Sequence, residues 1–270
     1  MVQSLPRPLA LSPSRVNDYE NCPLKYRLRA IDRLEEPETK AQVKGTLVHA
    51  VLETMHQWSR EERTFPAAVK QLKPHWETLC QQAPSRRTLV PEGDFYPFLV
   101  ECRDLLRGYF LMENPQGFDA TACEAYVEDN FDGVPVRGYI DRIDIAPTGE
   151  VRLVDYKTGK KPAPRFQQSA VFQMRFYGLV YWRQHDHIPE QLRLMYLKKA
   201  DSMYLQPRPA ELNATQRTLE RVWESIRRDG EAGNFRPKRN ALCNWCSFQA
   251  LCPAFDGTPP QYPGWPGSQG

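Results

Sequence analysis

The chain has neither a long hydrophobic run nor a large net charge. None of its 270 residues lies in an apolar stretch approaching the ~18 consecutive positions that a membrane span requires. The opening residues also lack the continuous apolar block of a secretory signal peptide. Lys and Arg number 36 and Asp and Glu 33, so the formal net charge is only +3. A charge this small gives no chain-wide attraction to nucleic acid or to a membrane surface, and we expect a cytoplasmic protein without a membrane partner.

Two motifs that mark particular enzyme classes are missing as well. No GxxxxGK[ST] sequence occurs, which excludes a P-loop for nucleotide phosphates within these residues. No HExxH sequence occurs either, which excludes the helix-borne zinc site of the metalloproteases that use it. Seven cysteines are present, and in a reducing cytoplasm their spacing points to metal binding rather than to disulfides.

The spacing of apolar residues changes from helical to strand-like after residue 115. Before it, helical spacing predicts four helices, at 12–34, 43–60, 67–82 and 94–112. Beyond it, alternating apolar and polar residues predict a three-stranded meander in EAYVEDNF, VRGYIDRIDI and VRLVDYK. The same reasoning predicts three later elements: a helix at 166–184, a hairpin at 191–198 and 202–206, and a helix at 212–232 capped by Asn213 or Thr215.

This order of elements predicts an α/β protein with a central mixed β-sheet flanked by helices. One domain is expected over 1–253. Its parts are a mainly helical region (12–115), a core (120–210), and a helix with a cysteine segment (211–253). Residues 254–270 are rich in Pro and Gly, and we expect them to be disordered.

Two aspartates and a lysine form the strongest local signal. Asp141 and Asp155 lie on successive predicted strands joined by a turn at 147–149, so their carboxylates can meet across an antiparallel pair. Such hard oxygen ligands suit Mg²⁺ or Mn²⁺. Lys157 follows Asp155 by two positions and therefore points to the same face of the strand. An ammonium there can orient water and stabilise charge on a phosphate.

The segments GYIDRID and LVDYKTG together resemble the PD-(D/E)XK nuclease superfamily. Within it they are similar to the RecB-like exonucleases, a branch that includes AddB nuclease domains and CRISPR-associated iron–sulfur nucleases. The resemblance implies a restriction-endonuclease-like core. It also implies that Asp141, Asp155 and the Tyr156 carbonyl bind the divalent metal, while Lys157 serves the attacking water.

Two further motifs extend the resemblance. GTLVHAVLE, residues 45–53, looks like the helix that supplies this branch with a metal-binding histidine, here His49. A competing interpretation is a wholly helix-borne site of His49, Glu53 and His56, which share one helical face. QMRFY, residues 173–177, resembles the Q-x-x-x-Y motif, which implies that Gln173 and Tyr177 support the active site.

The family pattern also implies one more acidic residue upstream of Gly138. Two candidates remain open there, Glu124 and Glu128.

A second group of residues is formed by cysteines. Cys243, Cys246 and Cys252 fall within ten positions, but three thiols do not close a tetrahedral site. Cys22 is the candidate fourth ligand, because the other three cysteines lie in segments where a buried thiol is the simpler explanation. The residues alone leave structural Zn²⁺ and an iron–sulfur cluster both open. The resemblance implies a [4Fe–4S] cluster on these four cysteines.

Basic and aromatic residues offer candidate contacts for DNA. Basic residues gather after the Lys157 strand and before the cysteine triplet. The aromatic residues near the predicted cluster that could stack on bases are Tyr19, Tyr26, Phe235 and Trp245.

These observations predict a metal-dependent DNA nuclease, an exonuclease acting on DNA ends or single strands in repair or recombination. Two alternatives remain open. The chain could be a DNA-end-binding or CRISPR-adaptation subunit whose nuclease site is auxiliary to a helicase or another partner. It could also be a non-catalytic, zinc-stabilised DNA-binding module, although that leaves the His, Asp and Lys set unexplained.

Overall fold

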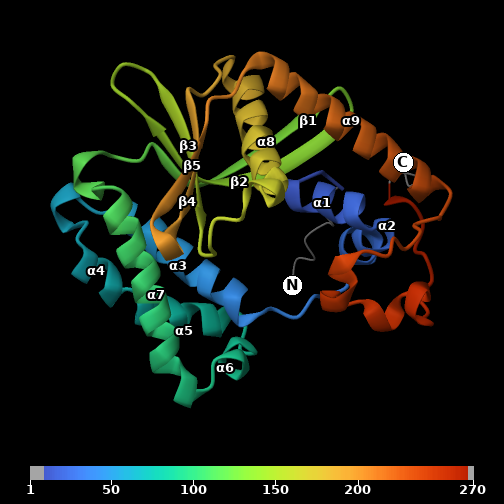
Figure 1. Ribbon diagram of the computed structural model, residues 1–270, viewed down its shortest axis with the longest axis horizontal. Coiled ribbons are helices and arrows are strands. Elements are labelled where there is room, and N and C mark those ends of the chain that lie inside the picture. The colour runs from blue at the N-terminus through green and yellow to red at the C-terminus, as the bar shows by residue number, and fades with distance from the viewer. Residues whose placement is uncertain (1–8, 267–270) are drawn as a thin grey trace, which may run out of the picture. The chain divides into compact units, whose positions relative to one another are not determined.

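The computed structural model describes residues 9–266, and the chain folds into two compact units (Figure 1). Within the described residues, the cysteine unit comprises 9–37, 128–138 and 210–266. The sheet unit comprises 38–127 and 139–209. Each unit is therefore assembled from segments that are far apart in the sequence.

The helices of the sheet unit come mainly before its strands. The first of them, α3 (Lys40–His56), begins at a capping box in which Thr39 and Gln42 satisfy each other's backbone amides. The other helices are α4 (Phe65–Lys70), α5 (Leu72–Gln82), α6 (Arg86–Leu89), α7 (Glu92–Met112) and α8 (Gln168–His185). The predicted helical region is thus confirmed, with the helix expected at 67–82 divided into α4 and α5.

The five strands form one sheet in the order β1-β2-β3-β4-β5. Their bounds are β1 (Ala122–Phe131), β2 (Val134–Ile145), β3 (Val151–Lys157), β4 (Gln191–Tyr196) and β5 (Asp201–Leu205). β2 pairs antiparallel with β3, and β4 with β5, whereas β3 and β4 run parallel. A parallel pair needs a crossover connection, and α8 supplies it. The mixed sheet flanked by helices confirms the predicted fold class.

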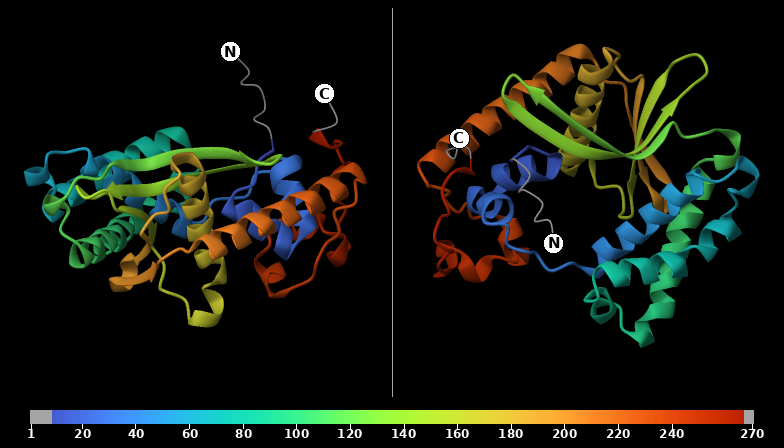
Figure 2. Two further views of the ribbon diagram at one scale, coloured as in Figure 1. Left: turned by 90° about the horizontal axis from the view of Figure 1, so that it is seen from above. Right: turned by 180° about the vertical axis from the view of Figure 1, so that it is seen from behind.

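Alternation along β3 determines what each face of the sheet contacts. Val154 and Tyr156 join a buried cluster built from α3, α5 and α7. Asp155 and Lys157 point the other way, because successive side chains of a strand alternate, and α8 packs against β3 and β4. Figure 2 shows the sheet with these helices from two further directions. Asp155 and Lys157 therefore lie on the face of β3 that α8 covers, and Val154 and Tyr156 lie on the face toward α3, α5 and α7.

The cysteine unit begins with short helices where one long helix was predicted. α1 (Pro13–Asn21) ends at Cys22, whose backbone is extended, and α2 (Pro23–Tyr26) continues into a π-helix at Arg27–Ile31. Pro23 has no amide hydrogen, so it fits the first turn of a new helix but not the interior of an old one. The break places Cys22 between two helix ends.

The last long helix and the C-terminal residues differ from the prediction. α9 runs from Pro209 to Glu231, so Asn213 and Thr215 lie inside the helix and neither caps it. Residues 254–266, expected to be disordered, are described and make contacts within the cysteine unit. Tyr262 donates a hydrogen bond to the Gly230 carbonyl, and the Trp265 ring lies near that of Trp223. Residues 267–270 lie outside the described part of the chain.

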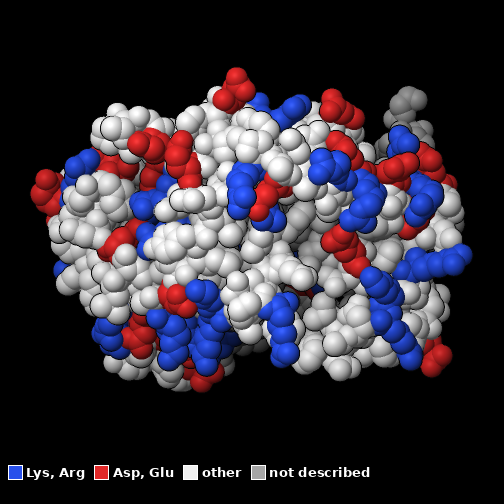
Figure 3. All heavy atoms as spheres, turned by 45° about the horizontal axis from the view of Figure 1, so that its top comes forward, with Lys and Arg blue, Asp and Glu red and all other residues white. Residues whose placement is uncertain are grey.

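The surface agrees with the small net charge. Figure 3 shows acidic and basic side chains interspersed over the face it presents. Among residues 9–266, no helix combines the length and apolar character needed to cross a bilayer.

Candidate functional site

The candidate site lies where strands β2 and β3 stop pairing. Their register runs from Ile145 opposite Val151 to Arg142 opposite Val154. Asp141 and Asp155, one residue further on each strand, stand at the point where the strands separate. There the Asp141 carboxylate accepts a hydrogen bond of 2.7 Å from the backbone amide of Tyr156. The Asp141 side chain thus takes the hydrogen bond that a paired β2 backbone would have made, and this contact holds Asp141 beside β3.

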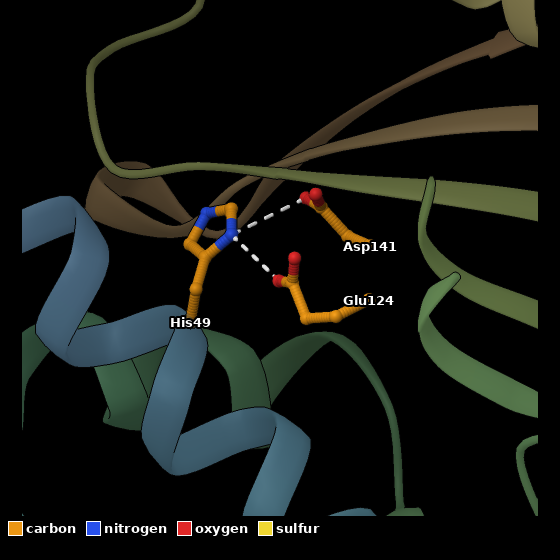
Figure 4. Close-up of side chains that lie close together, drawn as sticks. All are labelled: His49, Glu124 and Asp141. Carbon is orange, nitrogen blue, oxygen red and sulfur yellow. Dashed lines mark ion pairs between the residues drawn. The ribbon is translucent and has the colours of Figure 1, made fainter. Parts of the chain in front are cut away.

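Three potential metal ligands converge beside this junction. His49 on α3, Glu124 on β1 and Asp141 on β2 bring ligand atoms within 4.8 Å of one another. Figure 4 shows both carboxylates turned toward the same imidazole nitrogen. The His49 Nδ1 atom lies 3.5 Å from Glu124 and 3.6 Å from Asp141. One nitrogen and two carboxylate oxygens from three different elements make a His-Glu-Asp site.

The backbone at Glu124 explains how this residue reaches the group. Its φ of +46° lies in the left-handed region, which is uncommon for any residue other than glycine. Such an irregularity within a strand redirects the side chain relative to its neighbours. The unusual conformation is thus found at a residue of the site.

Burial and mutual charge interactions shift the pKa values of the clustered groups. Burial raises the pKa of Asp141 above its ordinary value, and the Asp155 carboxylate raises it further. Burial alone would lower the pKa of His49, but Glu124, Asp141 and Asp155 together raise it to about 9. Carboxylates this close together raise one another's pKa. A bound cation would offset that repulsion and favour their ionised forms.

A second set of contacts joins β3 to α8. Lys157 Nζ lies 2.8 Å from an Asp155 carboxylate oxygen and donates to Gln173 Oε1 at 2.8 Å. The Gln173 amide in turn donates to the other Asp155 oxygen at 2.7 Å. Gln173 therefore bridges the carboxylate and the ammonium, which holds both side chains in fixed positions.

Lys157 is held as a cation. Burial would lower the pKa of this lysine, but the carboxylates of Asp155 and Asp141 outweigh that effect and raise it. A charged ammonium can donate hydrogen bonds and stabilise negative charge, but it cannot accept a proton. Tyr177, one turn beyond Gln173, is buried, and burial raises the pKa of its hydroxyl.

The structure separates the two sequence interpretations of α3. His49 Nε2 lies 3.0 Å from the Tyr156 carbonyl oxygen, so the histidine faces the junction of the strands. His56 points elsewhere: its Nε2 lies 3.0 Å from the Tyr109 hydroxyl and 3.3 Å from Arg142 in a buried cluster. The helix-borne site of His49, Glu53 and His56 is therefore wrong, because His56 is occupied in the core.

The predicted residues otherwise come together, with one addition. All seven of the predicted residues belong to the sheet unit: His49, Asp141, Asp155, Tyr156, Lys157, Gln173 and Tyr177. The contacts above connect the first six, and Tyr177 lies one turn beyond Gln173 on α8. Glu124 rather than Glu128 joins His49 and Asp141. Counting positions in the sequence could not choose between the two acids, because the choice depends on the irregular backbone at Glu124.

The site opens into a cleft of the sheet unit. Its lining includes His49, Glu124, Tyr139, Lys157 and Lys160. A lining with both carboxylate and ammonium groups suits a ligand that carries both a metal-binding oxygen and negative charge, such as a phosphodiester.

The four cysteines singled out in the sequence also line one pocket, in the cysteine unit. Cys22, Cys243, Cys246 and Cys252 all contribute to its wall. Two of the sulfurs lie near backbone amides: Cys22 Sγ is 3.5 Å from the Lys238 nitrogen, and Cys243 Sγ is 3.4 Å from the Asn240 nitrogen. Leu24, Leu28 and Phe248 form the apolar packing behind the thiols.

The aromatic candidates for base stacking are mostly buried. Tyr19, Tyr26 and Phe235 are each less than a tenth exposed, so they belong to the core of the cysteine unit. Trp245 is 77% exposed.

Comparison with known proteins places the chain among nucleases. The model of the PD-(D/E)XK nuclease superfamily matches residues 10–253. Two curated relatives are phage proteins, both called Gene 69 protein. The one from Mycobacterium phage D29 is 28% identical, and the one from Mycobacterium phage L5 is 24% identical. Each alignment covers 90% of this chain and 96% of the relative.

A solved structure shares the fold. A protein from Eubacterium rectale, named as a candidate exonuclease, superposes with a TM-score of 0.59 at 12% sequence identity. The match covers 88% of this chain and 86% of that one. At such low identity the likeness concerns the fold alone.

Proposed function

The chain belongs to the PD-(D/E)XK nuclease superfamily, and we propose that it is a Mg²⁺- or Mn²⁺-dependent deoxyribonuclease. We propose further that it acts as an exonuclease on DNA ends or single strands, in repair or recombination. The observation that carries the proposal is the junction of β2 and β3. There a His-Glu-Asp group lies beside the Asp155, Lys157 and Gln173 contacts.

The donor set at the junction fits a divalent cation. Glu124 and Asp141 supply hard oxygens, Asp155 and the Tyr156 carbonyl lie beside them, and His49 supplies a nitrogen. Mg²⁺ favours carboxylates and water, and Mn²⁺ accepts imidazole more readily. When bound, such an ion would lower the pKa of a coordinated water and polarise a phosphate oxygen.

The chain's own residues then have distinct tasks. Lys157 is held charged within hydrogen-bond distance of Asp155, so it can orient a water by donation and stabilise charge that develops on the phosphate. Gln173 fixes both partners of that ion pair. Tyr177 packs in the next turn of α8 and supports the position of Gln173. Hydrolysis by a positioned water needs no covalent intermediate with the protein.

Degradation of DNA by two single variants tests the proposal. Asp155→Ala and Lys157→Ala should each abolish Mg²⁺- or Mn²⁺-dependent release of nucleotides from end-labelled DNA. Asp155 is buried and paired with Lys157, so circular dichroism and urea unfolding must accompany the assay and show that both variants are folded under its conditions. Undiminished cleavage by both variants would place the active site elsewhere.

We also propose that Cys22, Cys243, Cys246 and Cys252 bind a [4Fe–4S] cluster. Support comes from four thiols lining one pocket and from two amide contacts to their sulfurs. Hydrogen bonds to the sulfurs and apolar surroundings influence the reduction potential of such clusters. Structural zinc is the alternative outcome.

Metal analysis separates these two outcomes without any assay of activity. Protein purified without oxygen should be brown, with iron and acid-labile sulfide in equal amounts, about four of each per chain. Cys22→Ser should lose the colour. A colourless protein that carries one zinc would overturn the cluster and leave the nuclease proposal standing.

A further inference from the structure

Two tyrosines lie beside the candidate site on the strands that carry its acidic residues. Tyr126 follows Glu124 by two positions on β1, and Tyr139 precedes Asp141 by two positions on β2. Their rings are 5.2 Å apart, with planes inclined at 54°. Both residues belong to the sheet unit, like the site itself.

The tyrosines remain accessible although they touch each other. Tyr126 is 42% exposed and Tyr139 is 50% exposed. A cross-strand aromatic pair stabilises a β-ribbon, and that alone could account for their contact. It does not account for where they lie, because Tyr139 also lines the cleft that contains His49, Glu124 and Lys157.

Tyr139 lies on the same strand as Asp141, one of the clustered metal-ligand candidates. Residues i and i+2 of a strand share a face and are separated by about 7 Å. Asp141 is one of the clustered ligands, so the ring of Tyr139 lies on the same face as the metal-binding group. From a phosphate held at Asp141, a base of the same or the adjacent nucleotide can extend to a ring at that separation.

The rest of the cleft suits the backbone of the same ligand. Lys157 and Lys160 lie on its wall, and ammonium groups attract phosphates without regard to sequence. A groove that combines positive charge with exposed aromatic rings is the usual arrangement for single-stranded nucleic acid. Bases paired within a duplex are stacked on their neighbours and present no free face to such a ring.

We propose that Tyr126 and Tyr139 form a stacking platform for one or two unpaired bases beside the phosphate that is cleaved. The ligand is therefore a DNA single strand, or the unpaired end of a duplex. This proposal rests on the proposed nuclease function of the same site. It assigns the preference for unpaired over paired DNA to these two tyrosines.

Binding measured without divalent metal tests the platform apart from cleavage. Three probes are compared by fluorescence anisotropy: a labelled oligothymidylate, the same strand in a duplex, and a strand of equal length without bases. Tyr139→Ala and Tyr139→Leu should each bind oligothymidylate about tenfold more weakly, since loss of one aromatic platform removes stacking of one base. Tyr139→Trp should restore binding, because it restores a stacking face.

A matched control is available on another element. Tyr96 on α7 is 75% exposed and lies outside the lining of the cleft, so Tyr96→Ala should bind like the wild-type chain. The strand without bases should bind weakly and to the same extent in every variant, because only phosphate contacts remain. Tyr126→Ala should weaken oligothymidylate binding in the same direction as Tyr139→Ala.

Two results would overturn the platform. One is wild-type affinity for oligothymidylate in the double variant that carries both Tyr126→Ala and Tyr139→Ala. The other is an equal loss for oligothymidylate and for the strand without bases, which would mean that the tyrosines act through the protein or the phosphates. A chain that shows the expected binding pattern but never cleaves DNA would instead contradict the nuclease proposal, so the two failures are distinguishable.

Discussion

At the scale of single residues, Arg142 forms a buried network that holds Tyr156 next to the candidate site. Its side chain is completely buried and forms ion pairs with Glu113 and Asp144. It also donates to the Tyr156 hydroxyl at 2.7 Å. The Tyr156 backbone holds the Asp141 carboxylate and meets His49. A buried cation on one face of the sheet thereby positions the ligands gathered at its edge.

Replacing this arginine should therefore be costly. Arg142→Met leaves two buried carboxylates with fewer partners, which destabilises a fold by about 3 kcal/mol or more. Arg152→Met is the matched control, because Arg152 pairs with the same Asp144 but is partly exposed. Its loss should cost about 1 kcal/mol or less. Urea unfolding at neutral pH measures both changes, and equal costs would show that burial of Arg142 is unimportant.

His56 gives the fold a dependence on pH. Burial, with Arg142 close by, lowers its pKa to about 3. The unfolded chain binds a proton at His56 below about pH 6.5 while the folded chain does not. This contribution to stability is thus complete above pH 6.5 and is lost progressively as the pH falls toward 3.

From pH 7 to pH 5 the loss attributable to His56 should be about 2 kcal/mol, at 1.4 kcal/mol per pH unit below 6.5. His56→Gln cannot titrate, so its free energy of unfolding should fall by correspondingly less over the same interval. Urea titrations at the two pH values provide the measurement. An identical pH dependence in wild type and variant would mean that folding leaves the pKa of His56 unchanged.

At the scale of elements, α7 packs closely against the 3-10 helix that follows β4 (Leu197–Lys199), and Gly108 lies at this contact. A Cβ atom built at Gly108 would collide with the backbone carbonyl of Leu197, which no side-chain movement can relieve. Gly108→Ala should therefore destabilise the chain by about 1–3 kcal/mol through forced separation of the two segments.

Gly93, in the first turn of the same helix, provides the control. Nothing lies within 4 Å of a Cβ there, so Gly93→Ala should be neutral or stabilising by up to about 1 kcal/mol. The thermal midpoints of the two variants should move in opposite directions or differ clearly. A loss of equal size at both positions would contradict close packing as the cause.

Much of this architecture follows from local sequence. Periodicity predicts the helices before residue 115 and the strands of the meander, because each element shows its own repeat of apolar positions. The Asp141, Asp155 and Lys157 set follows from alternation on strands. The parallel register of β3 and β4 depends on contacts over long separations. The break at Cys22 and the choice of Glu124 depend on backbone conformation, which residue spacing does not encode.

At the scale of the whole molecule, the cysteine unit is assembled from both ends of the sequence. Tyr19 on α1 donates to Asp229 on α9 at 2.7 Å, and Arg221 on α9 pairs with Glu20. A cluster held by Cys22 and the three later cysteines would add a link that closes a loop of more than two hundred residues. Closing a long loop restricts the unfolded chain most.

Loss of the proposed cluster should destabilise the cysteine unit and leave the sheet unit little changed. In Cys22→Ser, hydrogen exchange should accelerate within 13–31 and 240–255, because the proposed cluster ties those segments together. Residues 151–157 and 191–196 belong to the sheet unit, and their protection should change little. Exchange followed by mass spectrometry reports both regions at once, and uniform acceleration throughout would show that the units do not respond separately.

The Mn²⁺ concentration that gives half-maximal DNA hydrolysis tests the metal centre most directly, compared between Glu124→Gln and Glu128→Gln. Both acids are candidates by sequence, but only Glu124 meets His49 and Asp141 in the structure. Glu124→Gln should raise that concentration at least tenfold, in the range seen when a group that supports a metal is removed, or abolish hydrolysis altogether. Glu128→Gln should behave like the wild-type chain. Wild-type Mn²⁺ dependence in Glu124→Gln would contradict the account.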